Sequence, residues 1–368
     1  MDSSCDSVGI DVPESLLGKQ KEEPIMGHDT RIAVDVAKAV FEVAISDRPG
    51  HVVRRERLTR DQFLPFIAQQ PVATVVMEAC GSSHHWARKI EGLGHPVVLL
   101  PPHQVRPYIR GNKTDRTDAK GILEASRNEE IHPVPIKSVA QQVLTSLHRL
   151  RSGWVAERTA RLNAMRGLLR ELGFFIPMGA EKVVPTLHAL IEDAESELPD
   201  GLRNILYEAC HEIRDIEARI KQTEAQLDAT AHQIPTVALL RTVPGIGPLT
   251  STALVAFLGN IQRFPSGRHL ASYLGLTPRE FSSGLKRRLG RISKRGDGYL
   301  RTLLIHGARS VLLHARKTQP DRLRLWAHKL EKTHVHNKAA VAVANKMARI
   351  LWAVWSRQTP YGSITKAA

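Results

Sequence analysis

Cysteine is scarce in this sequence of 368 residues, with Cys5, Cys80 and Cys210 scattered along the chain. Their positions show neither the paired spacing of a zinc site nor the even count of a disulfide scaffold, which argues against both classes of protein. A reducing compartment fits this pattern. Because Cys80 follows an apolar run, we predict it to be a small buried thiol at the end of a strand.

Long apolar runs are also missing. No stretch approaches the roughly 18 to 20 residues that a membrane-spanning helix needs. The N-terminal sequence lacks the basic start and apolar centre of a signal peptide, so we predict a flexible leader over residues 1–29. The last residues, 357–368, look like a tail. The protein is therefore expected to stay in the cytoplasm.

Acidic residues are in the minority. The chain carries 52 Lys and Arg against 37 Asp and Glu, with a formal charge of +15 and a pI near 10.0. Such a balance concerns partners rather than fold, and it favours nucleic acid. The excess is greatest over residues 278–301, PREFSSGLKRRLGRISKRGDGYLR, where eight basic residues stand against two acids. We expect the nucleic-acid backbone to contact Lys113, Arg116, Arg279, Lys286, Arg287, Arg288, Arg291, Lys294, Arg295 and Arg301.

Strands and helices alternate over residues 30–136. RIAVDVAKAVFEVAISD predicts two short strands, and HVVRRERLT a third. A helix at DQFLPFIAQQ, a strand at VATVVMEAC, a helix at SSHHWARKIEGLG and a strand at HPVVLLPP follow. A β-hairpin followed by β/α alternation predicts a mixed sheet covered by helices, an α/β domain of ribonuclease H-like fold.

Two long helical segments occupy residues 137–235. The first begins after Ser138, a plausible N-cap, and ends before Gly173. In the second, from Leu202 to Ile234, apolar residues recur in alternating steps of four and three, the seam of a coiled coil. The number of heptads does not decide whether this seam pairs with another copy of the chain or packs within its own domain.

A mainly α-helical domain is predicted over residues 236–356. It opens with VPGIGPLTSTAL, which has the form of a helix-hairpin-helix element. Gly245 and Gly247 allow a tight turn, and Pro248 opens a helix whose free N–H groups can hold a phosphate. The alternative is a plain αα-hairpin without DNA contact.

Four acids stand out in the N-terminal half. Asp35 lies inside an apolar strand and Glu78 ends another, where an isolated charge is costly. Asp115 and Asp118 are three residues apart, so they share a face if a helix begins there. Each acid alone has an ordinary explanation, as a surface acid, a helix cap or a strand end. Together they match a set of oxygen ligands for Mg²⁺.

Six blocks of sequence, in order, resemble the DEDD-type transposases of bacterial insertion sequences, the IS one-ten family. They are VDVAK, MEACGS, NKTDRTDA, PGIG, GLTPREFSSG and RISKRGDGYLR, between about Arg31 and Trp355. The resemblance implies a RuvC-like domain that binds Mg²⁺ through the four acids, and a coiled coil that associates protomers into a dimer or tetramer. It also implies a C-terminal transposase domain with a helix-hairpin-helix, and a guide RNA encoded by the element.

The same resemblance implies a serine that attacks DNA and forms a covalent link. In the family pattern this serine directly precedes a glycine, which points to Ser283 in PREFSSG. Ser282 and Ser293 stay open as rivals, because spacing alone does not choose. A serine hydroxyl is a poor nucleophile at neutral pH, so the arginines and the metal would have to supply an electropositive field. The resemblance allows the serine and the acids to come from different protomers.

A DNA transposase or recombinase that cuts and rejoins DNA is therefore the function predicted. Two alternatives stay open. A metal-dependent, structure-specific nuclease would use the four acids to activate water and would not need Ser283. A non-catalytic architectural DNA-binding protein would need neither the serine nor Asp35.

Overall fold

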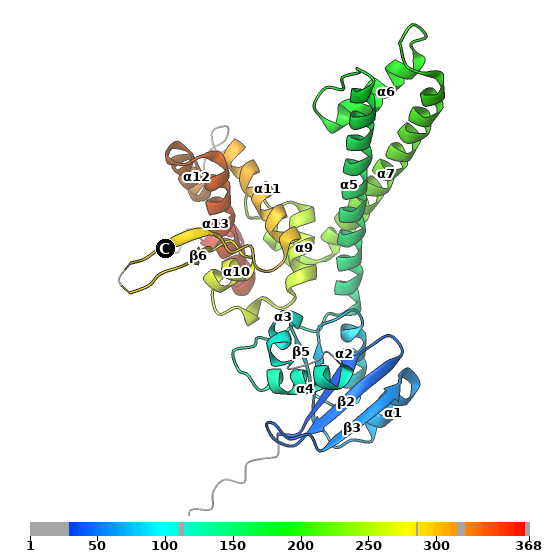
Figure 1. The fold of residues 1–368 in the computed structure, drawn as a ribbon. Helices are drawn as coiled ribbons and strands as arrows, with labels where there is room; N and C mark the ends of the chain where they lie inside the picture. The colour runs from blue at the N-terminus through cyan, green and yellow to red at the C-terminus, as the bar shows by residue number, and fades with distance from the viewer. Residues whose placement is uncertain (1–28, 110–113, 285, 315–320, 365–368) are drawn as a thin grey trace, which may run out of the picture. The chain divides into compact units, whose positions relative to one another are not determined.

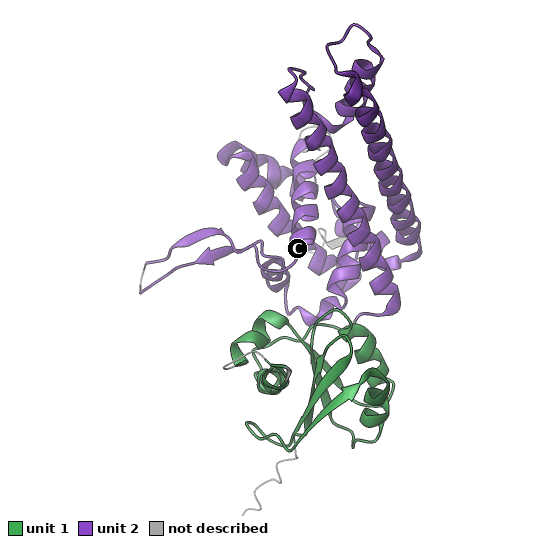
Figure 2. Cartoon of the chain, turned by 45° about the vertical axis from the view of Figure 1, so that its right-hand side comes forward, with its two compact units in different colours: residues 1–136 green, residues 137–368 purple. Residues whose placement is uncertain are grey.

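The computed structural model describes residues 29–109, 114–284, 286–314 and 321–364, which belong to two compact units (Figures 1 and 2). One unit comprises residues 1–136 and the other residues 137–368. Apart from Asp29, the predicted leader lies outside the described residues, and so does Lys113.

The first unit is built on a five-stranded sheet. Its strands are β1 (Arg31–Val36), β2 (Val40–Ser46), β3 (Arg54–Thr59), β4 (Thr74–Glu78) and β5 (Val97–Leu100). They lie in the order β3-β2-β1-β4-β5, with β1, β2 and β3 antiparallel and β1, β4 and β5 parallel. The predicted mixed sheet is confirmed, and this order is that of ribonuclease H-like folds.

Helices cover both faces of the sheet. They are α1 (Arg60–Ala68), α2 (Ser83–Glu91), α3 (Pro102–Val105), the short 3₁₀ turn η2 (Arg106–Tyr108) and α4 (Asp115–Ser126). Because successive strand residues point to opposite faces, β1 contributes to two cores. Ile32 and Val34 pack with α1 and α2, whereas Ala33 packs with α4. The prediction of a buried thiol at Cys80 is wrong: the strand ends at Glu78, and Cys80 is exposed.

Two long helices, α5 (Val139–Glu171) and α7 (Asp200–Gln233), pack side by side in the second unit, with 3₁₀ turn η3 (Ala180–Lys182) and α6 (Val183–Glu192) between them in sequence (Figure 1). Ser138 caps α5, since its hydroxyl accepts a hydrogen bond from the Gln141 N–H. Most of the predicted seam of α7 is buried: Leu206, Ile213, Ile216, Ile220, Thr223 and Leu227. Ion pairs join α5 to α7 at Arg151–Glu224 (2.6 Å) and Arg161–Glu212 (2.7 Å). The seam therefore packs within its own chain, and pairing with another copy stays a prediction.

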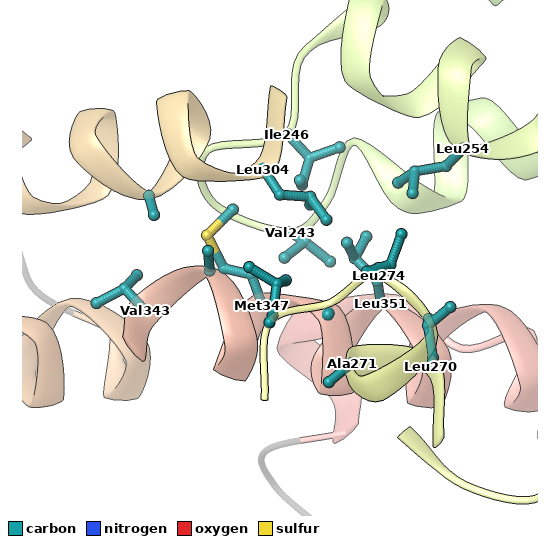
Figure 3. Packing of buried hydrophobic residues seen from close by; sticks show 14 of the residues in the cluster. Val243, Ile246, Leu254, Leu270, Ala271, Leu274, Leu304, Val343, Met347 and Leu351 are labelled. Atoms are coloured by element: carbon teal, nitrogen blue, oxygen red, sulfur yellow. The ribbon is translucent and has the colours of Figure 1, made fainter. Parts of the chain in front are cut away.

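The remaining helices of this unit enclose one apolar core. They are α8 (Pro235–Leu240), α9 (Pro248–Leu258), 3₁₀ turn η4 (Ile261–Arg263), α10 (Gly267–Tyr273), α11 (Gly298–His314), α12 (Arg322–Thr333), α13 (His336–Arg357) and α14 (Tyr361–Ile364). Met347 and Leu351 of α13 meet Leu304 of α11 and Val243 of the turn before α9 (Figure 3). The mainly helical character is as predicted. One pair of strands was not predicted, β6 (Pro278–Glu280) and β7 (Leu289–Ile292).

The described part of the predicted tail packs against this unit. Tyr361 is buried, and its N–H donates to the Thr242 hydroxyl at 3.0 Å. Its own hydroxyl lies 3.3 Å from Asp321, the residue that caps α12. Burial, with the Asp321 carboxylate beside it, raises the pKa of Tyr361 to about 12.

A close crossing joins the turn before α9 to α11. Gly245 has φ of +80°, and a Cβ placed on it would lie 2.5 Å from the carbonyl oxygen of Gly307. A Cβ on Gly307 would in turn meet the carbonyl oxygen of Gly245. Two backbones therefore touch at a point where neither residue can carry a side chain.

Gly307→Ala is expected to lower the free energy of unfolding by about 1 to 3 kcal/mol, because the new methyl group would push the turn away from α11. Urea titration measures this change. Gly153→Ala is the matched control, since Gly153 lies in α5 with open space around its Cβ position. The control should gain up to about 1 kcal/mol from helix propensity. Equal stabilities of the two variants would contradict the close crossing.

A buried polar cluster connects α5, α9 and α11. The His148 side chain is buried, with Nδ1 3.0 Å from the Tyr299 hydroxyl and Nε2 3.1 Å from the Thr252 hydroxyl. Burial, together with the positive charge of Arg151, lowers the pKa of His148 to about 4.

This lowered pKa predicts a pH-dependent stability. Above about pH 6.5 His148 is neutral in both the folded and unfolded protein, so it does not make the free energy of unfolding depend on pH. Between pH 6.5 and about 4 only the unfolded chain takes up the proton, so the free energy of unfolding should fall with pH by about 2 to 3 kcal/mol. Urea titrations at pH 7 and pH 4 measure it. A His148→Gln variant should show a flatter dependence, and an unchanged slope would contradict the assignment.

Candidate functional site

Two of the four predicted acids lie on neighbouring strands of the first unit. Parallel pairing of β1 with β4 runs through Val34 and Met77, so that Asp35 and Glu78 come next on the two strands. Alternation places both on the face covered by α4, together with the buried Ala33 and its neighbours. Both carboxylates are half-buried. The fold therefore brings Asp35 and Glu78 to one place on the sheet.

The other two acids lie on α4, which packs on the same face. Thr114 is the N-cap, because its hydroxyl accepts a hydrogen bond from the Thr117 N–H at 3.3 Å. Asp115 is thus the first helical residue rather than the cap, and its side chain lies outside the described part of the structure. Asp118 follows one turn later and is half-buried. The predicted helix start is confirmed.

Carboxylate oxygens from two strands and one helix are a donor set that suits a divalent cation. Among the side chains that the structure describes, no group of three His, Cys, Asp or Glu residues is placed to hold a metal ion. The carboxylate of Asp115 is not among them. Asp35 and Glu78 suit a divalent cation by their chemistry and by their position on adjacent parallel strands, and the full set of four ligands stays a prediction.

A basic pocket lies beside these acids. It has a volume of about 540 Å³ and is lined by Glu42, Arg55, Glu56, Arg57, Thr114 and Arg116. Burial, followed by the positive charge of Arg116, lowers the pKa of Arg55. Arg116 was among the residues predicted from the sequence to contact nucleic acid, whereas Arg55 and Arg57 were not. Their spacing in RRERLT was a signal, since residues two apart in a strand share a face.

The basic segment of the second unit forms an exposed arm. Strands β6 and β7 make a hairpin that projects from the helical body (Figure 1). Ser283 lies near its tip, where its N–H donates to the Lys286 carbonyl oxygen at 3.3 Å and Gly284 has φ of +55°. Seven of the predicted phosphate-binding residues are exposed on the arm and its base: Arg279, Lys286, Arg287, Arg288, Arg291, Lys294 and Arg295.

Hydrogen bonding separates the three candidate serines. The Ser282 hydroxyl donates to the Glu280 carboxylate at 2.6 Å and accepts from the Arg288 N–H at 3.2 Å. The Ser293 hydroxyl accepts from the Arg295 N–H at 3.4 Å. Within the described chain, the exposed Ser283 hydroxyl makes no hydrogen bond. Ser282 and Ser293 thus help to shape the arm and its base, whereas the Ser283 oxygen is available.

Arg301 lies at the base of the arm. Its guanidinium donates to the carbonyl oxygens of Leu274 at 3.1 Å and Arg295 at 2.9 Å. Gly275 and Gly296, with φ of +69° and +72°, bring two backbone segments together at the same place. The Arg301 side chain therefore has a structural partner on both sides of this junction, in addition to the phosphate contact predicted for it.

The glycine turn between α8 and α9 has a structural explanation of its own. Gly245 packs on Gly307, and Gly247 is the N-cap of α9 with Pro248 as its first residue. A cavity of about 690 Å³ lies beside the turn, and its lining includes Arg241 and Arg322. Phosphate binding at this element stays a prediction.

No helix within the described ranges is both long and apolar enough to cross a membrane.

Known proteins similar to this chain are transposases. Residues 237–323 match the family described as "Transposase IS116/IS110/IS902 family", and residues 32–174 match the DEDD_Tnp_IS110 family, described as "Transposase". The chain is 44% identical over 333 residues to the "Probable family 20 transposase" of Pseudomonas aeruginosa, covering 90% of this chain and 98% of that protein. It is 38% identical to the "Transposase for insertion sequence element IS1111A" of Coxiella burnetii, covering 90% of each chain. It is 36% identical to the "Transposase for insertion sequence element IS1328" of Yersinia enterocolitica, covering 91% of this chain and 99% of that one.

Proposed function

Because this chain belongs to the IS116/IS110/IS902 family of insertion-sequence transposases, we propose that it cuts and rejoins DNA through attack of the Ser283 hydroxyl on a phosphodiester. The observation that carries the proposal is the state of the serines on the arm. The exposed Ser283 hydroxyl has no hydrogen-bond partner among the described residues, whereas the Ser282 hydroxyl beside it makes two hydrogen bonds.

The reaction needs no external energy source. The Ser283 oxygen forms a bond to phosphorus while a deoxyribose oxygen leaves, carrying the proton that the serine gives up. The hydroxyl of another DNA end then attacks the phosphoserine and releases the serine. One P–O bond forms and one breaks in each step. The DNA is therefore joined again without a nucleotide cofactor.

The basic arm would supply the electrostatic field for this attack. Arg279, Arg287 and Arg288 are exposed on the same hairpin as Ser283. Guanidinium groups bind pairs of phosphate oxygens and stabilise the charge that develops on them in the transition state. The other basic residues of the arm would position the backbone, and the affinity they give should fall steeply with salt.

A divalent metal, which we propose to be Mg²⁺, would be held by Asp35, Glu78, Asp115 and Asp118. Transposase domains of the DEDD type typically use a divalent metal. When bound, such an ion supplies Lewis-acid stabilisation of phosphate oxygens. The support in this chain is the placement of Asp35 and Glu78 at the ends of adjacent strands, on the face that α4 covers.

Further partners follow from the family and from the surface of the chain. We propose that an RNA encoded by the element guides the choice of DNA, and that the protein acts as a homodimer or tetramer in the bacterial cytoplasm. The charge of +15 favours binding to both nucleic acids. Ile205 and Tyr207, which are exposed on α7, favour association of copies.

The test is a search for protein-linked DNA. Purified protein is incubated with labelled DNA that carries an end of its element, any RNA encoded beside it, and Mg²⁺, and the products are separated on a denaturing gel. A labelled species that migrates with the protein and disappears after protease treatment is expected. Cleaved DNA without a linked species would indicate the nuclease instead, and binding without any processing would indicate an architectural protein.

A further inference from the structure

Strand pairing places residues of the basic pocket in one row with the carboxylate of Asp35. Antiparallel pairing places Asp35 opposite Glu42 on β2, and Glu42 opposite Arg57 on β3. Residues directly opposite each other share a face of the sheet, so the three side chains form one row. Two strand spacings, about 10 Å, separate the backbones of Asp35 and Arg57. The pocket therefore continues the row of acids across the same face.

The charges around the pocket do not balance. Three arginines, Arg55, Arg57 and Arg116, line it together with Glu42 and Glu56. The Glu56 carboxylate accepts from Arg54 Nε at 2.7 Å. Two positive charges are thus left over. Arg55 donates to the carbonyl oxygen of Arg116 at 3.1 Å, a neutral group that leaves both charges in place.

A phosphodiester fits this excess by charge and by shape. Guanidinium forks bind phosphate oxygens in pairs. Arg57 is exposed, and its guanidinium makes no hydrogen bond or ion pair with any described residue. Thr114 adds a hydroxyl to the lining at the start of α4. The pocket is open to a chain passing over the sheet rather than shaped for a compact metabolite, since its lining is polar and charged throughout.

We propose that Arg55, Arg57 and Arg116 hold a backbone phosphate of the nucleic-acid strand that reaches the carboxylates of the first unit. This inference rests on the proposed function, because it assumes that nucleic acid is processed there. It adds Arg55 and Arg57 to Arg116, which the sequence had already predicted to contact nucleic acid, and it joins the three in one site. The pocket orients the strand, while the acids and the serine carry out the chemistry.

The test uses full-length protein and a labelled single-stranded oligonucleotide, made once as DNA and once as RNA, in EDTA over a series of salt concentrations. Arg57→Gln should weaken binding about 5- to 10-fold at low salt and reduce the slope of log affinity against log salt by about 0.7. A double variant with Arg55→Gln should roughly double the change in slope. Melting temperatures would show that the variants remain folded.

Arg54→Gln is the matched control. Arg54 lies on the same strand with its side chain on the opposite face, paired with Glu56 and over the ring of Phe66 at 5.2 Å. It should change affinity less than twofold. Equal effects of Arg54→Gln and Arg57→Gln would overturn the proposal, as would normal binding by the double variant.

Comparing the DNA and RNA oligonucleotides shows which polymer supplies the phosphate that the pocket binds. A loss confined to DNA or to RNA supports the pocket and identifies the polymer it holds, and a loss with both supports a contact to the shared backbone. Because these measurements need no metal and no turnover, they stand apart from the gel assay for protein-linked DNA. If the wild-type protein forms no link but Arg57→Gln still weakens binding, the proposed function fails and the pocket remains.

Discussion

Ser283→Ala is expected to form no protein-linked DNA, with a yield at least about a thousandfold below that of the wild type. Alanine lacks the oxygen that would bond to phosphorus, and the loss of a covalent nucleophile removes the step rather than slowing it. The arm should keep its shape, since the Ser283 hydroxyl makes no hydrogen bond within the described chain. DNA binding should therefore stay within twofold of the wild type while the linked product disappears from the gel.

Ser282→Ala is the control for this variant. It removes the hydrogen bonds to Glu280 and Arg288, each worth about 1 kcal/mol, so the arm should loosen and the yield should fall about tenfold or less. If the link survived in Ser283→Ala and vanished in Ser282→Ala, the nucleophile would be Ser282. Free cleaved ends in Ser283→Ala, at the wild-type rate, would identify the protein as a metal-dependent nuclease.

Asp35→Asn is expected to lower the rate of DNA cleavage by about a hundredfold or more in the presence of Mg²⁺. The amide keeps the shape of the side chain but gives up the negative charge that a divalent cation needs. Binding to DNA in EDTA should be unchanged or slightly stronger.

Asp61→Asn provides the comparison for Asp35→Asn. Asp61 is exposed in the first turn of α1, on the other face of the same unit. It should leave cleavage within twofold of the wild type at every Mg²⁺ concentration. Full cleavage by Asp35→Asn would show that Asp35 is not needed for the reaction and would contradict the proposed role of the acids. A loss of cleavage that higher Mg²⁺ restores would place Asp35 among the metal ligands.

The regular elements of this protein were predictable because their causes are local. Ser138 begins α5 through a capping box with Gln141, which follows only three residues later in the printed sequence. Short apolar runs predicted the strands around Asp35 and Glu78, and the three-residue step from Asp115 to Asp118 predicted that they share a face of a helix. The order of these elements predicted the mixed sheet.

The arm was not predicted, because β6 and β7 are short and polar and show no alternation of apolar residues. Arg55 and Arg57 went unnoticed for a related reason. Their strand, RRERLT, carries charges on both faces, so the sequence does not tell which face meets the acids. The pairing of Arg57 with Glu42 decides which face of the strand meets the acids. This register between strands is established only when the sheet forms, so the sequence of one strand does not reveal it.

The sequence by itself determined the residue types, the helix starts and the excess of positive charge, because each depends on neighbouring residues or on composition. Tertiary structure decided which groups are committed elsewhere. Gly245 packs against Gly307, and Arg301 holds two carbonyl oxygens. The Ser282 hydroxyl is hydrogen-bonded, whereas the Ser283 hydroxyl makes no hydrogen bond to a residue that the structure describes. These distinctions arise from contacts between segments that folding brings together. A hydroxyl is available for chemistry only where none of these contacts occupies its oxygen.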